Sequence, residues 1–288
     1  MSILIAILQG IIQGLTEFLP ISSSGHLSLF QHFTGQNGEG SLFFTVMLHI
    51  GTMMAVIIRF FRTILNLIAE FFRMLFDILT GKFRFKEANP MQRMVIMILL
   101  ALLPLIPFYL IKDVFTQLAE DDDILVEGVC FLITGGLLIL ADRCVRGNKA
   151  ANKMKGSDAL LIGTFQGIAA LPGVSRSGST IAAGLLSGLS DEYAVEFSFI
   201  LGVPVILATS ALEMRDALRT DYTIEILPLI VGVVTSFVVG LGAIKLISWL
   251  IKKGRFAVFA YYTLTLGFLV LIAGVIELLT GNRFMLLF

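Results

Sequence analysis

Long apolar segments constrain this chain more than any other feature of its sequence. Crossing a bilayer as a helix takes about 20 mostly apolar residues. Six segments meet that requirement: 42–62, 92–111, 125–142, 194–212, 226–250 and 256–280. We expect Pro204 to break the helix over 194–212. Charged residues make up only 15% of the 288 positions, against about 25% in a typical soluble domain. The sequence therefore predicts an all-α, polytopic membrane protein with six spanning helices.

The charges between these segments predict an orientation. Basic residues gather in 62–93, 143–155 and 252–255, whereas 120–123 is acidic. Basic loops stay on the cytoplasmic side, so both termini should lie outside. Within the first basic stretch, segment 64–80 carries one polar stripe of Asn66, Glu70, Arg73 and Asp77. We expect an amphipathic helix at the membrane surface there. The net charge is zero, which gives no indication of a nucleic-acid partner.

Two further segments, 1–33 and 157–191, are apolar but interrupted by Pro, Gly, Ser and charged residues. With an offset of 153 positions, 10–25 aligns with 163–178, and six of the sixteen positions are identical. The loop charges make the first segment enter from outside and the second from inside. The sequence thus predicts two re-entrant helical hairpins in inverted-topology repeats, where irregular backbone surrounds a ligand site near the midplane. Their serine-rich turns should meet there, with Ser23 or Glu17 within about one diphosphate's length of Arg176. Repeat one would cover 1–111 and repeat two 157–250, within a single membrane domain, 1–288.

The first hairpin contains titratable groups. Gln13 and Glu17 are four residues apart and share one helix face. An ionisable group in an apolar helix needs a partner or a function, and the spacing alone leaves both open. In PISSSGHL, residues 20–27, the proline ends a helix and a serine can cap the next one. With Glu17 and His26 beside them, these serines are also candidates for nucleophilic chemistry.

The second hairpin has a fixed cation instead. Its motif LPGVSRSGST, residues 171–180, has Arg176 where the first copy has Ser23, and Ala170 where the first has Glu17. Arginine suits bidentate recognition of phosphate. The alternative is that Arg176 simply neutralises Glu17 or Glu196.

The motifs QGLTEFLPISSSGH and LPGVSRSGST resemble those of the undecaprenyl-diphosphatase family, also called bacitracin-resistance proteins. Length and segment order agree along the whole chain. The resemblance implies an integral membrane phosphatase that hydrolyses undecaprenyl diphosphate to the monophosphate and thereby recycles the lipid carrier of cell-wall synthesis. It also implies dependence on a divalent cation, Mg²⁺ or Ca²⁺.

The resemblance assigns roles to individual positions. Gln13 and Glu17 match the family's E/Q-x-x-x-E element, Ser23 the candidate nucleophile and His26 the essential histidine. Ser175, Arg176 and Thr180 match P-G-x-S-R-S-x-x-T. Many members have Glu where this chain has Gln13, so more of the metal binding falls on Glu17.

We therefore expect three groups of site residues. The catalytic residues would be Glu17, Ser23, His26 and Arg176. The diphosphate would be bound by Ser22, Ser24, Ser175, Ser177 and Thr180. The cation would be held by Glu17 with Gln13. Ser23 would attack the terminal phosphorus while His26 or Glu17 takes the proton, with water or His26 as alternative nucleophiles.

An alternative hypothesis is that the chain is not an enzyme but a polyprenyl-phosphate flippase or anion transporter, because inverted repeats with broken helices are common in carriers. The Glu–Ser–His cluster in one hairpin favours the phosphatase. For that enzyme we expect a polyprenyl diphosphate lipid as substrate and the bacterial cytoplasmic membrane as location. Its site should open toward the extracytoplasmic side, where we also expect the loop 34–41, which is polar and has no basic residue. The sequence leaves the oligomeric state open, a dimer included.

Overall fold

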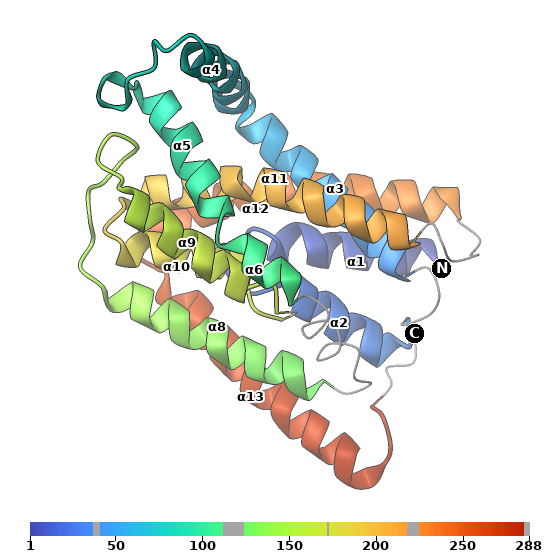
Figure 1. The fold of residues 1–288 in the computed structure, drawn as a ribbon. Helices are drawn as coiled ribbons and strands as arrows, with labels where there is room; N and C mark the ends of the chain where they lie inside the picture. Colours follow the sequence, from blue (N-terminus) through green and yellow to red (C-terminus); the bar gives the residue numbers. More distant parts are fainter. Residues whose placement is uncertain (37–40, 112–123, 172, 218–224, 285–288) are drawn as a thin grey trace.

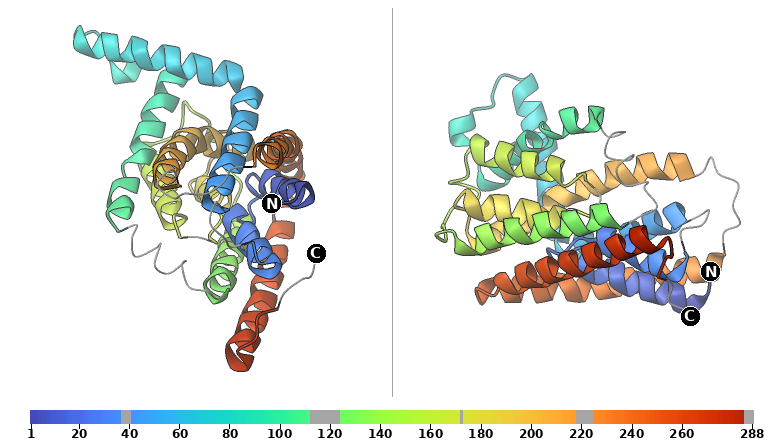
Figure 2. Two further views of the ribbon diagram at one scale, coloured as in Figure 1. Left: turned by 90° about the vertical axis from the view of Figure 1, so that its right-hand side faces the viewer. Right: turned by 90° about the horizontal axis from the view of Figure 1, so that it is seen from below.

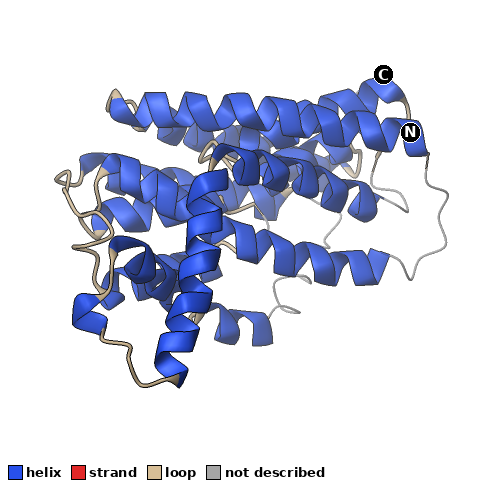
Figure 3. Ribbon diagram, turned by 90° about the horizontal axis from the view of Figure 1, so that it is seen from above, coloured by secondary structure: helices blue, strands red, loops and turns tan. Residues whose placement is uncertain are grey.

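The computed structural model describes residues 1–36, 41–111, 124–171, 173–217 and 225–284. Within these ranges the chain is helical and contains no strand (Figure 3). Six helices or helix runs are long and apolar enough to span a membrane. They are α3 (Ser41–Arg59), α5 with α6 (Pro90–Leu102 and Leu105–Leu110), α8 (Leu125–Arg143), α11 (Asp191–Ala217), α12 (Ile226–Lys252) and α13 (Ala257–Thr280). All six expected spans are confirmed as helical, five as single helices and one as the pair α5 and α6.

Pro104 and Pro204 affect their spanning helices in different ways. Helix α5 ends at Leu102 and α6 begins at Leu105, directly after Pro104, so the expected span 92–111 is two helices. We expected Pro204 to break the span 194–212, and this was wrong, because α11 continues through it. Proline removes one hydrogen bond. In apolar surroundings the neighbouring helical bonds have no water to compete with them, so the loss of one need not end the helix.

Helix α4 (Phe61–Leu79) turns away from α3 at Phe60 and projects from one end of the bundle (Figure 2). Leu67 and Met74 are its buried residues. Leu65, Phe72 and other large apolar side chains are exposed. An exposed apolar face beside a polar stripe agrees with the amphipathic helix expected over 64–80.

Four shorter helices form two pairs. They are α1 (Ile3–Thr16) with α2 (Ser23–Thr34), and α9 (Gly156–Ile168) with α10 (Arg176–Leu186). The two pairs occupy opposite ends of the bundle, and the turn of each pair points to its middle (Figures 1 and 2). The N-terminus lies at the end that holds α1 and α2, away from α4 (Figure 1).

Glycines bring the first helix of each pair close to a spanning helix. A Cβ atom on Gly10 or Gly14 would lie 2.7 Å or 2.8 Å from backbone oxygens of α12. A Cβ atom on Gly163 would lie 2.1 Å from the carbonyl oxygen of Ala101 in α5. A Cβ atom on Gly167 would lie 2.1 Å from a side chain of α6, so glycines four residues apart serve close helix packing in both pairs.

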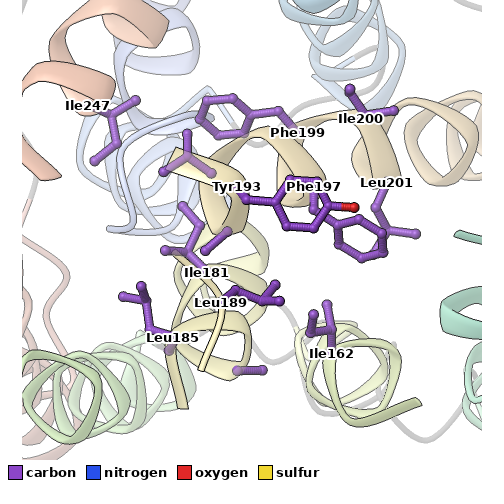
Figure 4. Close-up of a cluster of buried hydrophobic side chains, with 14 of the residues drawn as sticks. Ile162, Ile181, Leu185, Leu189, Tyr193, Phe197, Phe199, Ile200, Leu201 and Ile247 are labelled. Atoms are coloured by element: carbon purple, nitrogen blue, oxygen red, sulfur yellow. The ribbon is translucent and has the colours of Figure 1, made fainter. Parts of the chain in front are cut away.

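The core surrounds the second pair (Figure 4). Ile181 and Leu185 of α10 pack with Phe197 and Leu201 of α11, and all four side chains are at most 1% exposed. This cluster fixes α10, whose first residue is Arg176.

Some expectations fall outside the described ranges. These are the acidic segment 120–123, Pro172, and residues 37–40 of the loop that leaves the first pair.

Candidate active site

The first helix pair places a carboxylate and a hydroxyl at its turn. Helix α1 ends at Thr16, Glu17 follows directly, and Ser23 is the first residue of α2. Ser22 caps α2 by accepting a hydrogen bond from the Gly25 N–H at 3.2 Å, as serine commonly does at this position. Ser22 has φ of 74°, which a non-glycine residue keeps only where the surrounding structure enforces it.

The second pair builds its turn in the same way. Ser175 stands 153 positions after Ser22 and caps α10 by accepting from the Gly178 N–H at 3.0 Å. The hydroxyls of Ser22 and Ser24 lie 3.4 Å apart, and so do those of Ser175 and Ser177. Two helix N-termini, the ends that favour anions, are thus formed by equivalent residues.

The two turns contact each other. An Nη2 hydrogen of Arg176 is donated to Glu17 Oε1, forming an ion pair between residues 159 positions apart. The Gly173 N–H donates to Ser24 Oγ at 3.1 Å, and Ser177 Oγ donates to the Leu19 carbonyl at 3.3 Å. The expectation that the two serine-rich turns meet is confirmed. The alternative hypothesis, in which Arg176 simply neutralises Glu17, is equally consistent with this ion pair. The position of Arg176 alone therefore does not assign its role.

The other oxygen of Glu17 serves the first pair. Its Oε2 accepts from Ser23 Oγ at 2.7 Å and from Gln13 Nε2 at 3.0 Å. Glu17 is 5% exposed, whereas Ser23 is only partly buried. A buried carboxylate needs such donors. The hydrogen bond from Ser23 joins a potential nucleophile, the hydroxyl group, to a base that can accept its proton.

Glycine makes room for the arginine. A Cβ atom at Gly202 of α11 would lie 1.9 Å from Arg176 Nη1. The guanidinium group therefore occupies space that any other residue at this position would fill.

The His26 side chain of α2 contacts α13 rather than Glu17. Its Nδ1 is 2.7 Å from the Ser22 carbonyl, and its Nε2 is 2.7 Å from the Tyr262 hydroxyl of α13. Since a carbonyl can only accept, Nδ1 is the donor, and Nε2 of the neutral ring accepts from Tyr262. Both ring nitrogens are occupied by groups other than Ser23 and Glu17.

The hydroxyls of the second turn mostly support its backbone. Thr180 Oγ1 donates to the Arg176 carbonyl at 2.9 Å and also contacts the Ser198 hydroxyl. The Ser175 N–H donates to Thr134 Oγ1 at 3.1 Å. These bonds fix the start of α10 and so position Arg176.

Two neighbours of the site were missed from the sequence. His49 of α3 places Nε2 at 3.7 Å from Glu17 Oε2, and Tyr262 binds His26. An ionisable residue in a spanning segment is by itself a sign of function, so His49 could have been noticed. Nothing in the sequence indicates Tyr262.

Oxygen ligands for a cation are present beside Glu17. Gln13 is fully buried, and its Oε1 has no hydrogen-bond partner in the described part of the chain. Carboxylate and amide oxygens are the ligands that Mg²⁺ and Ca²⁺ prefer, and Mg²⁺ uses few protein ligands when a substrate supplies phosphates. The described ranges hold no group of three or more His, Cys, Asp or Glu side chains placed to bind a metal. The side-chain oxygens of Glu17 and Gln13 are therefore suitable ligands for a cation that is also bound by the oxygens of a diphosphate.

A cavity of about 600 Å³ lies elsewhere, between the α3–α4 junction and the facing ends of α11 and α12. Its lining includes Arg59, Arg62, Glu196 and Lys252, and none of the residues at the two turns. The candidate site is therefore defined by converging polar groups rather than by this cavity.

Comparisons with known proteins agree along the chain. The family model described as "Bacitracin resistance protein BacA" matches residues 6–269. A protein of Alkaliphilus metalliredigens named undecaprenyl-diphosphatase is 39% identical over 271 residues, which cover 93% of this chain and 97% of the relative. Proteins with the same name from Halothermothrix orenii and Treponema denticola are 38% and 37% identical. They cover 94% and 93% of this chain, and 98% and 96% of their own lengths.

Proposed function

The chain belongs to the bacitracin resistance protein family, and we propose that it hydrolyses undecaprenyl diphosphate to undecaprenyl phosphate and inorganic phosphate. It is a multi-span membrane protein, and its similar relatives carry the name of this enzyme. The reaction returns the lipid carrier to peptidoglycan synthesis and so confers bacitracin resistance.

The observation that carries this proposal is the meeting of Arg176, Glu17 and Ser23 from two separate helix pairs. A guanidinium group grips phosphate oxygens through two parallel N–H bonds. A hydroxyl bonded to a carboxylate is an activated nucleophile. Groups that can bind and attack the terminal phosphate of a diphosphate thus lie side by side.

The bond lengths favour Ser23 with Glu17 as the reacting pair. Ser23 Oγ attacks the terminal phosphorus while its proton passes to Glu17 Oε2, 2.7 Å away. The bond to the bridging oxygen breaks and undecaprenyl phosphate leaves. Water then cleaves the serine phosphate ester and releases inorganic phosphate. Arg176 exchanges Glu17 for the phosphate oxygens, and the N-termini of α2 and α10 stabilise the charge.

Glu17 and Gln13 would hold a divalent cation, Mg²⁺ or Ca²⁺, beside the diphosphate. Such a cation neutralises phosphate charge and helps to align the reacting groups. The two helix N-termini that face the diphosphate are shaped by four serines: Ser22, Ser24, Ser175 and Ser177. Thr180 supports the backbone of Arg176 through its hydrogen bond to the Arg176 carbonyl.

The two helix pairs are proposed to be re-entrant hairpins of inverted repeats, 1–111 and 157–250. The matching caps of α2 and α10 support this, as do the opposite ends from which the pairs enter the bundle (Figure 1). With basic loops inside, the first pair enters from the extracytoplasmic side of the bacterial cytoplasmic membrane. The site opens to that side, and the prenyl chain remains in the outer leaflet.

The test is release of inorganic phosphate from undecaprenyl diphosphate by the purified protein in detergent, where no compartments exist. A phosphatase releases phosphate with multiple turnovers under these conditions. A flippase or anion transporter releases none, and that result would overturn the proposal.

A further inference from the structure

A third helix reaches the carboxylate of Glu17. His49 of α3 directs its Nε2 at Glu17 Oε2 from 3.7 Å, which is longer than a hydrogen bond. The His49 side chain is 22% exposed, so the protein does not enclose it on all sides. This contact lies on Oε2, opposite to the Oε1 atom that pairs with Arg176.

The other ring nitrogen fixes the tautomer. His49 Nδ1 is 2.9 Å from the Thr45 carbonyl, which can only accept, so Nδ1 carries the hydrogen. In the neutral ring Nε2 then presents its lone pair toward Glu17. Histidines that bind metals show this arrangement, with the second nitrogen donating to a backbone carbonyl or a carboxylate.

Gln13 adds an oxygen at the same place. Its Nε2 donates to Glu17 Oε2 at 3.0 Å, while its buried Oε1 is without a partner among the described residues. Rotation of the amide by half a turn exchanges the two atoms. It frees a lone pair on Glu17 Oε2 and turns Oε1 toward the same point.

We propose that His49 is a protein ligand of the divalent cation, together with Glu17 and Gln13. Two ligand atoms that each lie about 2.1 Å from one ion are at most about 4.2 Å apart, and the 3.7 Å between Nε2 and Oε2 satisfies this limit. The inference rests on the proposed function for the cation's role, but binding of the metal can be measured without substrate.

A nitrogen ligand changes which cations the site prefers. Mg²⁺ and Ca²⁺ favour oxygen ligands alone, whereas imidazole favours transition metals. One imidazole, one carboxylate and one amide oxygen should therefore bind Mn²⁺ more tightly than Mg²⁺.

The experiment is titration of the purified protein in detergent with Mn²⁺ and no substrate. Free Mn²⁺ is followed by electron paramagnetic resonance, and ¹⁴N coupling to the bound ion by its pulsed form. We expect ¹⁴N coupling from one imidazole in the wild type. His49→Gln should lose this coupling and bind Mn²⁺ at least about 10-fold more weakly, with less change for Mg²⁺.

The matched control is His32→Gln, which removes an imidazole that binds Glu277 of α13 instead. This variant should keep both the affinity and the ¹⁴N coupling, with circular dichroism confirming that each variant is folded. No Mn²⁺ binding, bound Mn²⁺ without ¹⁴N coupling, or coupling that persists in His49→Gln would overturn the proposal. Phosphate release from undecaprenyl diphosphate is assayed in parallel with Mg²⁺. If the wild type releases phosphate but His49 does not bind the cation, this proposal fails and the proposed function stands.

Discussion

Arg176 bridges the two helix pairs through a planar group that lysine does not have. In Arg176→Lys the charge remains, but the two parallel N–H bonds to phosphate are lost. We expect turnover of undecaprenyl diphosphate to fall on the order of 10²-fold, with circular dichroism unchanged. Initial rates of phosphate release measure this. Near-normal turnover would show that Arg176 serves only to balance the charge of Glu17.

Ser23 and Glu17 should behave as one unit because a 2.7 Å hydrogen bond joins nucleophile to base. Ser23→Ala and Glu17→Gln should each lower turnover by roughly 10³-fold or more, and the double variant should lose little beyond Glu17→Gln alone, which already removes both the base and the charged ligand of the cation. Single-turnover rates of the three proteins test this. Losses that multiply would point to separate binding roles, and strong activity in Ser23→Ala would favour water or His26 as nucleophile.

At this scale the sequence indicated some partners and not others. The 153-residue offset and the opposite loop charges predicted that Ser23 or Glu17 lies within a diphosphate's length of Arg176, because the equivalent turns of two inverted hairpins would face each other. His49 beside Glu17 and Tyr262 beside His26 depend on how α3 and α13 are rotated about their axes. Hydropathy does not determine that rotation when a helix is apolar all round.

Among the elements, α9 is positioned by a glycine contact that can be tested directly. In Gly163→Ala the new methyl group would meet the Ala101 carbonyl of α5 at 2.1 Å, which forces the helices apart. We expect a loss of about 1–3 kcal/mol in stability, seen as a lower unfolding temperature, together with reduced phosphate release because the second turn shifts.

Gly242→Ala is the matched control. A Cβ atom on this glycine of α12 meets nothing within 4 Å, and alanine is the better helix former by about 1 kcal/mol. This variant should be as stable as the wild type or more so. Equal destabilisation of both variants would contradict the packing account.

The helices themselves were largely predictable, because a long apolar segment satisfies its backbone hydrogen bonds in a membrane by forming a helix. The break at Pro104 and the continuous helix through Pro204 were not, since their outcome depends on which neighbours surround each proline. Amphipathic α4 was predictable from its stripe alone.

The orientation of the whole molecule is a prediction with a direct test. Ser2 and Lys153 lie in segments that the loop charges assign to opposite sides of the membrane. In a background with Cys130 and Cys144 replaced, Ser2→Cys should react with a membrane-impermeant thiol reagent on intact cells. Lys153→Cys should react only after permeabilisation. The reverse pattern would turn the molecule over and place the opening of the site on the cytoplasmic side.

The central claim is that two turns, one from each half of the chain, form a single phosphatase site. The most direct measurement is phosphate release from undecaprenyl diphosphate by purified wild type, Glu17→Ala and Arg176→Ala in detergent, with folding verified for each. We predict sustained release by the wild type and loss of turnover by at least about 10²-fold in both variants, one from each turn. Wild-type turnover in a folded Glu17→Ala or Arg176→Ala protein would contradict the account.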